Sequence, residues 1–579
     1  MPVADDDQAI LIHNEELPHE PGPSNMVGVA DTDPPEGSNK RPVEYEDDFA
    51  EHQLVRIPDD DDSTSFSLKK LWAFTGPGFL MCIAYLDPGN IESDLQSGAT
   101  ARYGLLWVLF YATVLGLLLQ RMASRLGVVS GKHMAEVAHS YYPKKPRIVL
   151  WIMVEIAIIC SDMQEVIGTA IALNLLSNGL IPLWVGVIVT ILDTITFLYF
   201  ERYGFRKLEA IFAVLISTMA VSFGYEYFVV NPDHFQVAKG IIVPWCPNCG
   251  STQFLQGISV VGAVIMPHNL YLHSALVKSR KIDRTRETKI KEANYYFFFE
   301  SAIALIISFF INVFVVAVFA HGFFGKSNVE IRDSCKKMEG MGDKIDIFPN
   351  NTEDATADIY KAGIFLGCEF GLPALYIWAL GILAAGQSST MTGTYSGQFV
   401  MEGFIQVRWA KWKRVFVTRA IAIAPTLGVA VWASDMDKLT GMNDLLNCVQ
   451  MIQLPFAIIP IITFTSSEKI MHEFKSSRPF QVFACLTSTI VIGINIFFIY
   501  DYITTALGTA WYVLICLSIA TLLYFGFICY LAVYCLVSIG IIPETWQLHG
   551  FSFQRPYETD APWLKIERLP EARTVTEIF

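Results

Sequence analysis

The sequence predicts an all-α integral membrane protein with twelve transmembrane helices. Of its 579 residues, 53% are hydrophobic and 13% aromatic, whereas only 17% are charged. An ordinary soluble domain carries about 25% charged residues, so a soluble protein is excluded. Apolar runs of about 20 residues, long enough to cross a bilayer, occur twelve times. They cover about 71–95, 104–120, 148–173, 180–200, 209–229, 255–277, 294–323, 364–392, 413–433, 440–466, 479–500 and 508–538.

The acidic charge of the chain belongs to its N-terminal tail. The formal net charge is −14, but the first 62 residues alone hold 18 Asp or Glu and three Lys or Arg. The rest is nearly neutral, which disfavours a nucleic-acid partner. The tail is rich in Pro, Asp, Glu and Gly and cannot bury enough apolar surface to fold. We predict a disordered cytoplasmic tail over 1–65, a transmembrane domain over 66–540 and a cytoplasmic C-terminal tail over 541–579.

The distribution of basic residues favours a topology with both termini in the cytosol. With the tail inside, the five inner loops contain 23 Lys and Arg, and the six outer segments contain nine. An excess of basic residues on the cytoplasmic side is the usual bias of membrane proteins. No cleavable signal peptide is visible, so the first span is expected to act as the insertion signal.

The outer loops carry a candidate glycan site and three cysteines. The longest outer loop, 324–363, contains a sequon that begins at Asn350. Cys246, Cys249 and Cys335 lie in outer loops, and the other eight cysteines fall in predicted spans. One disulfide is expected, either between Cys246 and Cys249 or from one of them to Cys335. A zinc knuckle would need a second ligand pair, which the sequence does not show.

The first and sixth spans each contain a proline that interrupts the helix. Span 1 reads Asp87-Pro-Gly-Asn90, and span 6 reads Met266-Pro-His-Asn269. Proline has no N–H and clashes with the carbonyl four residues earlier, so each helix is expected to open there. Interrupted helices at matching places in two halves of a 5+5 arrangement mark the substrate site of a transporter.

The groups at the two breaks favour a divalent transition metal as substrate. Asp87 is ionisable inside an apolar span, at a cost of about 2.5–3.5 kcal/mol, and such residues usually mark ion pathways. Asn90 adds an amide oxygen and Met266 a thioether. The carbonyls near Ala84 and Ala263 lose their helical partners and add further oxygens. Oxygen ligands with one soft sulfur suit Fe²⁺ or Mn²⁺ better than Ca²⁺ or Mg²⁺.

These motifs resemble the Nramp family of proton-coupled divalent metal transporters. The resemblance rests on the two broken-helix motifs and on the segment 386–403, and it covers about residues 66–540. Within the family the chain resembles animal divalent metal transporters of the iron and manganese type. The resemblance implies a LeuT-like fold: an inverted repeat of spans 1–5 and 6–10, with discontinuous helices 1 and 6, plus two extra helices. The corresponding ranges are about 71–229, 255–466 and 479–538.

The resemblance also implies the metal ligands. In the family the metal lies between the unwound parts of spans 1 and 6. A side-chain amide from span 10 completes the coordination shell in some conformations. Many bacterial members have Gln at this position, where this chain has Asn447. The metal is the cargo, so no resident cofactor and no enzymatic activity are expected. The matching positions are Asp87, Asn90, Met266, Asn447 and the carbonyls of Ala84 and Ala263.

A second set of residues resembles the family's proton route beside the metal site. Asp162 and Glu165 in span 3 are three residues apart and share a helical face. Arg419 begins span 9, and its guanidinium would hold a neighbouring carboxylate ionised until the arriving metal expels a proton. His268 and His273 follow the second break, and they could equally hydrogen-bond to exposed backbone. The candidate proton-pathway residues are Asp87, Glu155, Asp162, Glu165, His268, His273 and Arg419.

We therefore predict a secondary active transporter that imports Fe²⁺, Mn²⁺ and related dications by proton symport. The alternative is an ion-coupled small-solute symporter of the same fold, but Asp87 would repel the carboxylate of an amino acid. An intramembrane protease would need a His-Glu-x-x-His or Gly-x-Gly-Asp motif, and a channel would more naturally show pore-lining rings. Each motif alone also has an ordinary explanation. A methionine in an apolar helix, such as Met266, usually packs against other side chains, and an Asp-Pro-Gly-Asn segment usually forms a surface turn.

The tail gives a hint about location. Residues 7–12 resemble an acidic dileucine signal that sorting adaptors would bind. We expect a multi-pass protein of the plasma membrane and/or of endosomal or lysosomal membranes.

Overall fold

The structure is a computed structural model that describes the following residue ranges. These are 54–58, 66–200, 205–247, 249–338, 341–406, 411–432, 436–506, 511–543, 547–548, 551–553 and 557–567. Most of the predicted acidic tail, with the sorting motif at 7–12, lies outside the described residues.

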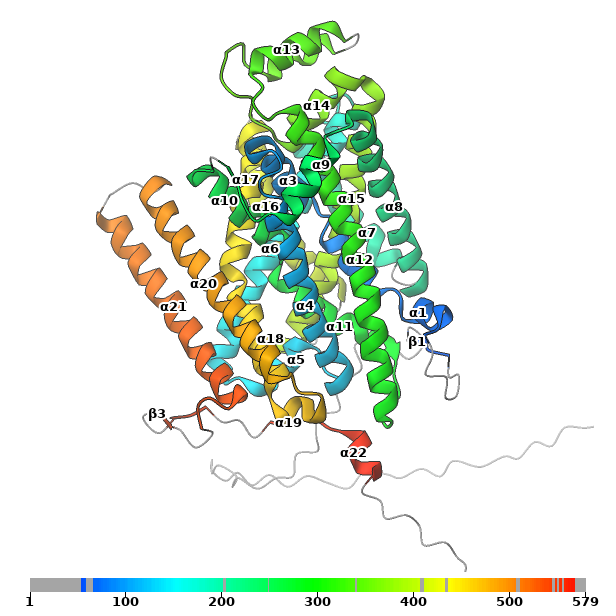
Figure 1. Ribbon diagram of the computed structural model, residues 1–579, viewed down its shortest axis with the longest axis vertical. Coiled ribbons are helices and arrows are strands. Elements are labelled where there is room, and N and C mark those ends of the chain that lie inside the picture. Colours follow the sequence, from blue (N-terminus) through cyan, green and yellow to red (C-terminus); the bar gives the residue numbers. More distant parts are fainter. Residues whose placement is uncertain are drawn as a thin grey trace, which may run out of the picture. The chain divides into compact units, whose positions relative to one another are not determined.

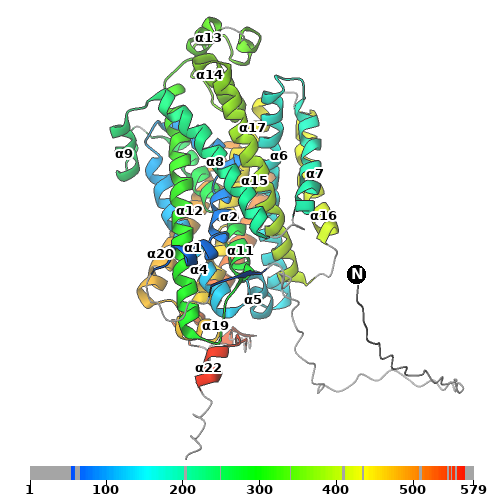
Figure 2. The ribbon, with the colours of Figure 1, turned by 90° about the vertical axis from the view of Figure 1, so that its right-hand side faces the viewer.

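Long helices form the body of the protein, and each predicted span coincides with one helix or with two helices in series (Figures 1 and 2). The unbroken helices are α4 (Leu106–Ser130), α6 (Lys144–Leu176), α7 (Leu183–Phe200), α8 (Phe205–Val230), α12 (Glu287–Gly322), α15 (Leu372–Ile405), α16 (Lys411–Trp432), α20 (Arg478–Ala506) and α21 (Trp511–Ile539). The pairs in series are α2 (Pro77–Ala84) with α3 (Pro88–Ala101), α10 (Ser251–Val264) with α11 (Pro267–Leu276), and α17 (Met436–Gln453) with α18 (Pro455–Ser466).

Short elements join these helices. The helices are α1 (Leu68–Phe74), α5 (Met134–Tyr141), α9 (His234–Ile242), α13 (Asn328–Lys337), α14 (Ile359–Phe370), α19 (Glu468–Met471) and α22 (Pro562–Glu567), with 3₁₀ turns at Val277–Ser279, Gly342–Ile347 and His472–Phe474. Two small sheets pair β1 (Val55–Arg56) in parallel with β2 (Arg280–Lys281), and β3 (Gln547–Leu548) antiparallel with β4 (Phe551–Ser552). Strand β1 lies within the predicted tail, so regular structure begins before the first span.

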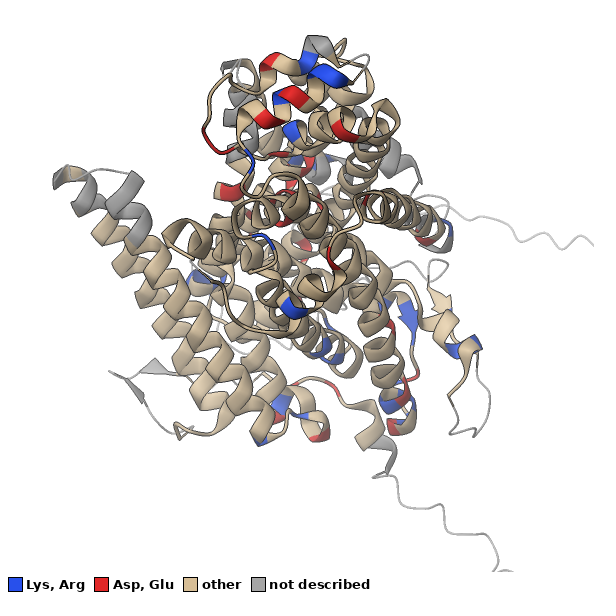
Figure 3. Ribbon diagram, turned by 45° about the horizontal axis from the view of Figure 1, so that its top comes forward, with Lys and Arg blue, Asp and Glu red and all other residues tan. Residues whose placement is uncertain are grey.

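Eight helical segments in the described part of the chain are long and apolar enough to cross a membrane. They lie in α4, α8, α10–α11, α12, α15, α17–α18, α20 and α21. Helix α6 is less apolar because it carries three carboxylates, and α2–α3 is interrupted by its break. The colours of the ribbon in Figure 3 mark charged residues mainly near helix ends, and α13 is rich in them, whereas α20 and α21 contain none along most of their length.

The eighth predicted span, 364–392, is wrong at both ends. Helix α14 ends at Phe370, and Gly371 turns the chain with φ 92° before α15 begins. A positive φ is readily adopted by glycine, and Pro373 in the first turn of α15 favours a new helix start. The apolar run crosses this turn without interruption, so hydrophobicity alone could not locate the boundary.

The cysteine pairing differs from the prediction in one respect. Cys246 bonds to Cys249, which is one of the two expected pairings. Cys335 bonds to Cys368, which had been assigned to a span but lies in α14. The second disulfide therefore ties α13 to α14. Asn350, the candidate glycan acceptor, is exposed in the segment between these two helices.

A close backbone contact between α3 and α12 gives a test of the packing. A Cβ added at Gly98 would overlap the Val316 carbonyl oxygen. This oxygen belongs to the backbone of α12, so it cannot move away as a side chain could. Gly98→Ala is expected to destabilise the protein by about 1–3 kcal/mol through overpacking. Gly493→Ala in α20 should be tolerated, because among the described residues no atom outside its own helix backbone lies within 4 Å of the added Cβ. Thermal unfolding of the two purified variants measures the difference, and equal melting temperatures would contradict it.

Candidate functional site

Asp87 and Met266 occupy equivalent positions in the two broken helices. Asp87 is the N-cap of α3 and Met266 is the N-cap of α11, with extended ψ angles of 165° and 129°. A proline follows each of them at the first helical position, where the missing N–H has no helical partner to lose. Their side chains are buried, at 1% and 2% exposed. The predicted breaks in spans 1 and 6 are confirmed.

The same prolines release one carbonyl at each break. The regular helical donor to the Ala84 carbonyl would be the N–H of residue 88, and the donor to Ala263 would be that of residue 267. Both positions are proline, so neither bond can form. Within the described ranges no other hydrogen bond to these two carbonyls occurs.

Elsewhere in the protein, neighbouring side chains satisfy carbonyls that proline has released. Two prolines in α18 free the carbonyls of Met451 and Phe456 in the same way. Asn495 Nδ2 donates to the Met451 carbonyl at 3.1 Å, and the Tyr271 hydroxyl donates to the Phe456 carbonyl at 3.1 Å. The two breaks in spans 1 and 6 differ because their carbonyls receive no such donor from the described residues.

The Asp87 carboxylate uses one oxygen to fix the loop and leaves the other open. Its Oδ1 accepts the backbone N–H of Asn90 at 2.7 Å and the Asn90 side-chain Nδ2 at 2.8 Å. Asp87 Oδ2 and Asn90 Oδ1 are buried without a hydrogen-bond partner among the residues the structure describes. A cation is the kind of ligand that satisfies several acceptors and brings none of its own.

Asn447 lies in α17 and links the two broken helices. Its Nδ2 donates to the Gly89 carbonyl at 3.1 Å and to Ser259 Oγ of α10 at 3.3 Å. Its Oδ1 accepts from Gln164 Nε2 at 2.7 Å. Gln450 Nε2 in turn donates to Gln164 Oε1 at 2.7 Å. Direct coordination of a metal by Asn447 would require its amide oxygen to leave Gln164.

Sequence reasoning missed this amide network. Asn443, Asn447 and Gln450 recur at the spacing of one helical face in α17. That polar stripe was the signal in the sequence. Gln164 lies between Asp162 and Glu165. These two acids were predicted as site residues, whereas Gln164 was not.

The acids of span 3 and the arginine of span 9 form a buried cluster. Arg419 Nη1 lies 3.2 Å from Asp162 Oδ1 and 3.1 Å from Glu165 Oε2, and no side chain of the three is more than 6% exposed. Gly393 of α15 leaves space for this cluster, because a Cβ at that position would overlap the carboxylates of Asp162 and Glu165. Breaking such a buried pair is strongly destabilising, since a charge is left without compensation.

The remaining predicted proton-pathway residues lie in α6 and α11. Glu155 is in α6, two turns before Asp162. His268 and His273 lie in α11 and are 3% and 0% exposed. Among the described residues His268 Nδ1 has no hydrogen-bond partner.

The donor set at the breaks is chemically mixed. No group of three or more His, Cys, Asp and Glu that could hold a metal occurs in the described ranges. A site here would instead combine the carboxylate of Asp87, the amide of Asn90, the thioether of Met266 and the carbonyls of Ala84 and Ala263.

Comparisons with known proteins agree with this geometry. The family described as natural resistance-associated macrophage protein-like, Nramp, matches residues 78–501. The NRAMP-like transporter smf-1 of Caenorhabditis elegans is 64% identical over 522 residues, covering 90% of this chain and 93% of that protein.

Solved structures give the same result for the fold. A mutant of the Eremococcus coleocola manganese transporter has a TM-score of 0.70 at 30% identity, covering 85% of this chain and 99% of the other. A transporter of the nucleobase-cation-symport-1 family shares the fold, with a TM-score of 0.50 at 13% identity over 80% of this chain and 91% of that one. The expected all-α, LeuT-like fold is confirmed. The chain therefore belongs to the Nramp family, whose members are transporters of divalent metal ions and not enzymes.

Proposed function

We propose that the protein imports Mn²⁺, Fe²⁺ and related transition dications into the cytosol by proton symport. The observation that carries the proposal is the set of unsatisfied acceptors at the two breaks. Asp87 Oδ2, Asn90 Oδ1 and the carbonyls of Ala84 and Ala263 lack donors among the described residues, and Met266 lies at the same break as Ala263. An oxygen set with one sulfur suits Mn²⁺ and Fe²⁺. The solved relative from Eremococcus coleocola, which is described as a manganese transporter, supports this choice.

The alternative of an ion-coupled small-solute symporter fits the site less well. The open Asp87 oxygen presents negative charge at the break, and it would repel the carboxylate of an amino acid. A cation gains from the same charge.

Proton coupling is supported by the buried cluster of Asp162, Glu165 and Arg419. Arg419 forms ion pairs with both carboxylates and donates a hydrogen bond to Glu165 Oε2, whereas Asp87 Oδ2 and Asn90 Oδ1 have no partner among the described residues. A proton held by these carboxylates could therefore move without displacing a metal ligand. Arg419 also donates to the Thr390 carbonyl and to Thr394 Oγ1, which fixes its position.

The direction of import follows from the proposed topology. The outer side is assigned to the disulfide-bonded loops, because disulfides persist in oxidising compartments. The two termini and the basic loops then face the cytosol. This orientation fits the plasma membrane and endosomal or lysosomal membranes, with sorting adaptors reading the N-terminal tail.

Uptake of radioactive Mn²⁺ into proteoliposomes tests the proposal. One pH unit across the membrane is worth about 1.4 kcal/mol per proton, a factor of about ten. An inward proton gradient should therefore accelerate uptake, and collapsing it with a protonophore should remove the acceleration. Glu165→Gln should keep Mn²⁺ affinity but lose most of this pH dependence, because Glu165 lies off the proposed metal shell.

Glu287→Gln serves as the matched control, because Glu287 pairs with Lys291 on the surface of α12. It should respond to the gradient as the unmodified protein does. An unchanged pH dependence in the Glu165→Gln variant, at unchanged affinity, would show that the proton takes another route. No effect of the gradient on the unmodified protein would reject symport itself.

A further inference from the structure

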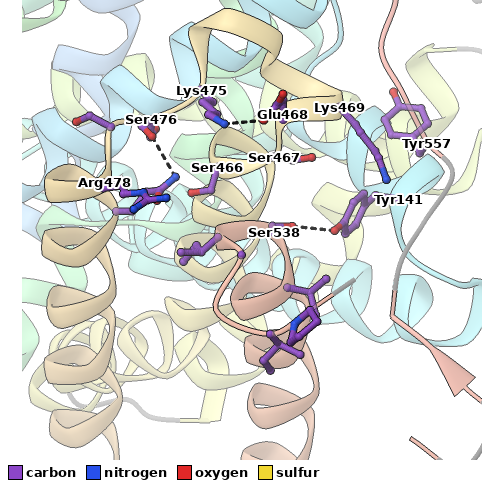
Figure 4. A pocket seen from close by; sticks show the side chains of 17 residues that line it. Tyr141, Ser466, Ser467, Glu468, Lys469, Lys475, Ser476, Arg478, Ser538 and Tyr557 are labelled. Carbon is purple, nitrogen blue, oxygen red and sulfur yellow. Dashed lines mark hydrogen bonds and ion pairs between the residues drawn. The ribbon is translucent and has the colours of Figure 1, made fainter. Parts of the chain in front are cut away.

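A polar cavity of about 820 Å³ lies at the end of the helix bundle that carries α19 (Figures 1 and 4). The end of α18, the short helix α19, the start of α20 and the end of α21 surround it. Its volume is that of a small-molecule site. The walls differ from the usual apolar lining, because Lys469, Lys475 and Arg478 all contribute to them.

Two buried hydroxyls in this cavity lack hydrogen-bond partners. Ser466 and Ser476 are 3% and 4% exposed, and neither Oγ has a partner among the described residues. Both line the cavity, as Figure 4 shows. A buried hydroxyl without a partner carries a desolvation penalty, which a ligand rich in acceptor oxygens would remove.

The charge of the cavity selects an anion. Three basic side chains and one carboxylate, that of Glu468, line the cavity. Glu468 Oε2 lies 2.6 Å from Lys475 Nζ. Because Lys475 donates a hydrogen bond to it, the pKa of Glu468 is lowered and the carboxylate stays ionised. An incoming anion would compete with Glu468 for Lys475 and would bind Lys469 and Arg478 in addition.

The position of the cavity favours a lipid as the source of the anion. Helices α20 and α21 contain segments able to cross a membrane, and the cavity borders the start of one and the end of the other. The ends of such helices lie at the level of the lipid headgroups. From this end, Val482, Leu486 and Ile490 follow one face of α20 and are 60%, 59% and 62% exposed, a surface suited to acyl chains.

We propose that this cavity binds the phosphate-bearing headgroup of an anionic membrane lipid. Lys469, Lys475 and Arg478 supply the charge, Ser466 and Ser476 donate hydrogen bonds to phosphate oxygens, and the acyl chains lie along α20. The site is separate from the metal pathway, and its occupancy reports on the lipid composition of the leaflet that it faces.

Binding of a fluorescent short-chain phosphatidylinositol bisphosphate to the purified full-length protein in neutral detergent tests the proposal. Replacing Lys469, Lys475 and Arg478 together by Gln should weaken binding by at least about tenfold, since each basic residue near a membrane contributes roughly fivefold. The matched control replaces two lysines and one arginine at the start of α12. These are Arg286, Lys289 and Lys291.

Two smaller changes separate the site from overall charge. Ser466→Ala with Ser476→Ala should weaken binding severalfold without altering charge. Glu468→Gln should tighten binding, because the competing carboxylate is gone. Equal affinities in the cavity triple variant and the α12 control, with both proteins monodisperse, would overturn the site.

A soluble headgroup distinguishes the two possible sources of phosphate. Inositol trisphosphate should bind more weakly than the lipid, because it lacks the chains that lie on α20. Binding of inositol trisphosphate as tight as that of the lipid would overturn the membrane source.

Discussion

Asp87→Asn is expected to abolish Mn²⁺ uptake while leaving a folded, membrane-inserted protein. The amide is nearly isosteric with the carboxylate, and its oxygen can still accept the N–H of Asn90. It cannot supply the negative charge of Asp87 Oδ2, a buried carboxylate oxygen that has no hydrogen-bond partner among the described residues. Uptake of radioactive Mn²⁺ into proteoliposomes, at equal amounts of reconstituted protein, measures the loss.

Asp346→Asn is the matched control, because Asp346 is 95% exposed and pairs with Arg332 on the surface. Its uptake should equal that of the unmodified protein. Isothermal titration with Mn²⁺ should show loss of binding in the Asp87→Asn variant alone. Uptake at the normal rate by that variant would contradict the assignment of the site.

Met266→Ala is expected to change which metals are carried. A thioether binds Cd²⁺ well and gives little to Ca²⁺, so removing it and admitting a water favours the harder ion. The variant should keep measurable Mn²⁺ uptake, lose most of its Cd²⁺ affinity and become sensitive to competing Ca²⁺. Competition of Cd²⁺ and Ca²⁺ against radioactive Mn²⁺ measures all three effects.

Met122→Ala separates coordination from packing. Met122 in α4 is 2% exposed, as Met266 is, and it lies outside the breaks. Truncating a buried methionine costs about 2–5 kcal/mol wherever it packs, so both variants should lose stability. Only Met266→Ala should alter the ratio of Cd²⁺ to Mn²⁺. Proportional losses of both metals in both variants would assign Met266 to packing.

The breaks could be predicted from the sequence because proline acts locally. A missing N–H at residues 88 and 267 removes one helical hydrogen bond whatever surrounds it, so Asp87 and Met266 could be placed at candidate breaks from the chain alone. The grouping of Arg419 with Asp162 and Glu165 joins residues about 250 positions apart. Only the resemblance to a family indicated that contact.

Other features depend on tertiary packing, which the local pattern does not encode. Cys368 lies in an apolar run, and nothing in that run shows that the chain turns at Gly371 and brings it to Cys335. The bonds of Asn447 to Gln164 and Gly89 depend on how α17 packs against α6 and α3. The sequence showed the polar residues but not their partners.

The two kinds of proline break have different consequences for the empty protein. Where Asn495 and Tyr271 donate to the released carbonyls, the bend is satisfied at all times. At Ala84 and Ala263 the carbonyls receive no such donor from the described residues, and in the proposed transport site a bound cation would satisfy them. Ligands that bind only the folded state stabilise it by mass action. A cell short of metal would therefore hold a less stable pool of transporter that proteases clear faster, so the supply of cargo would set the lifetime of its carrier.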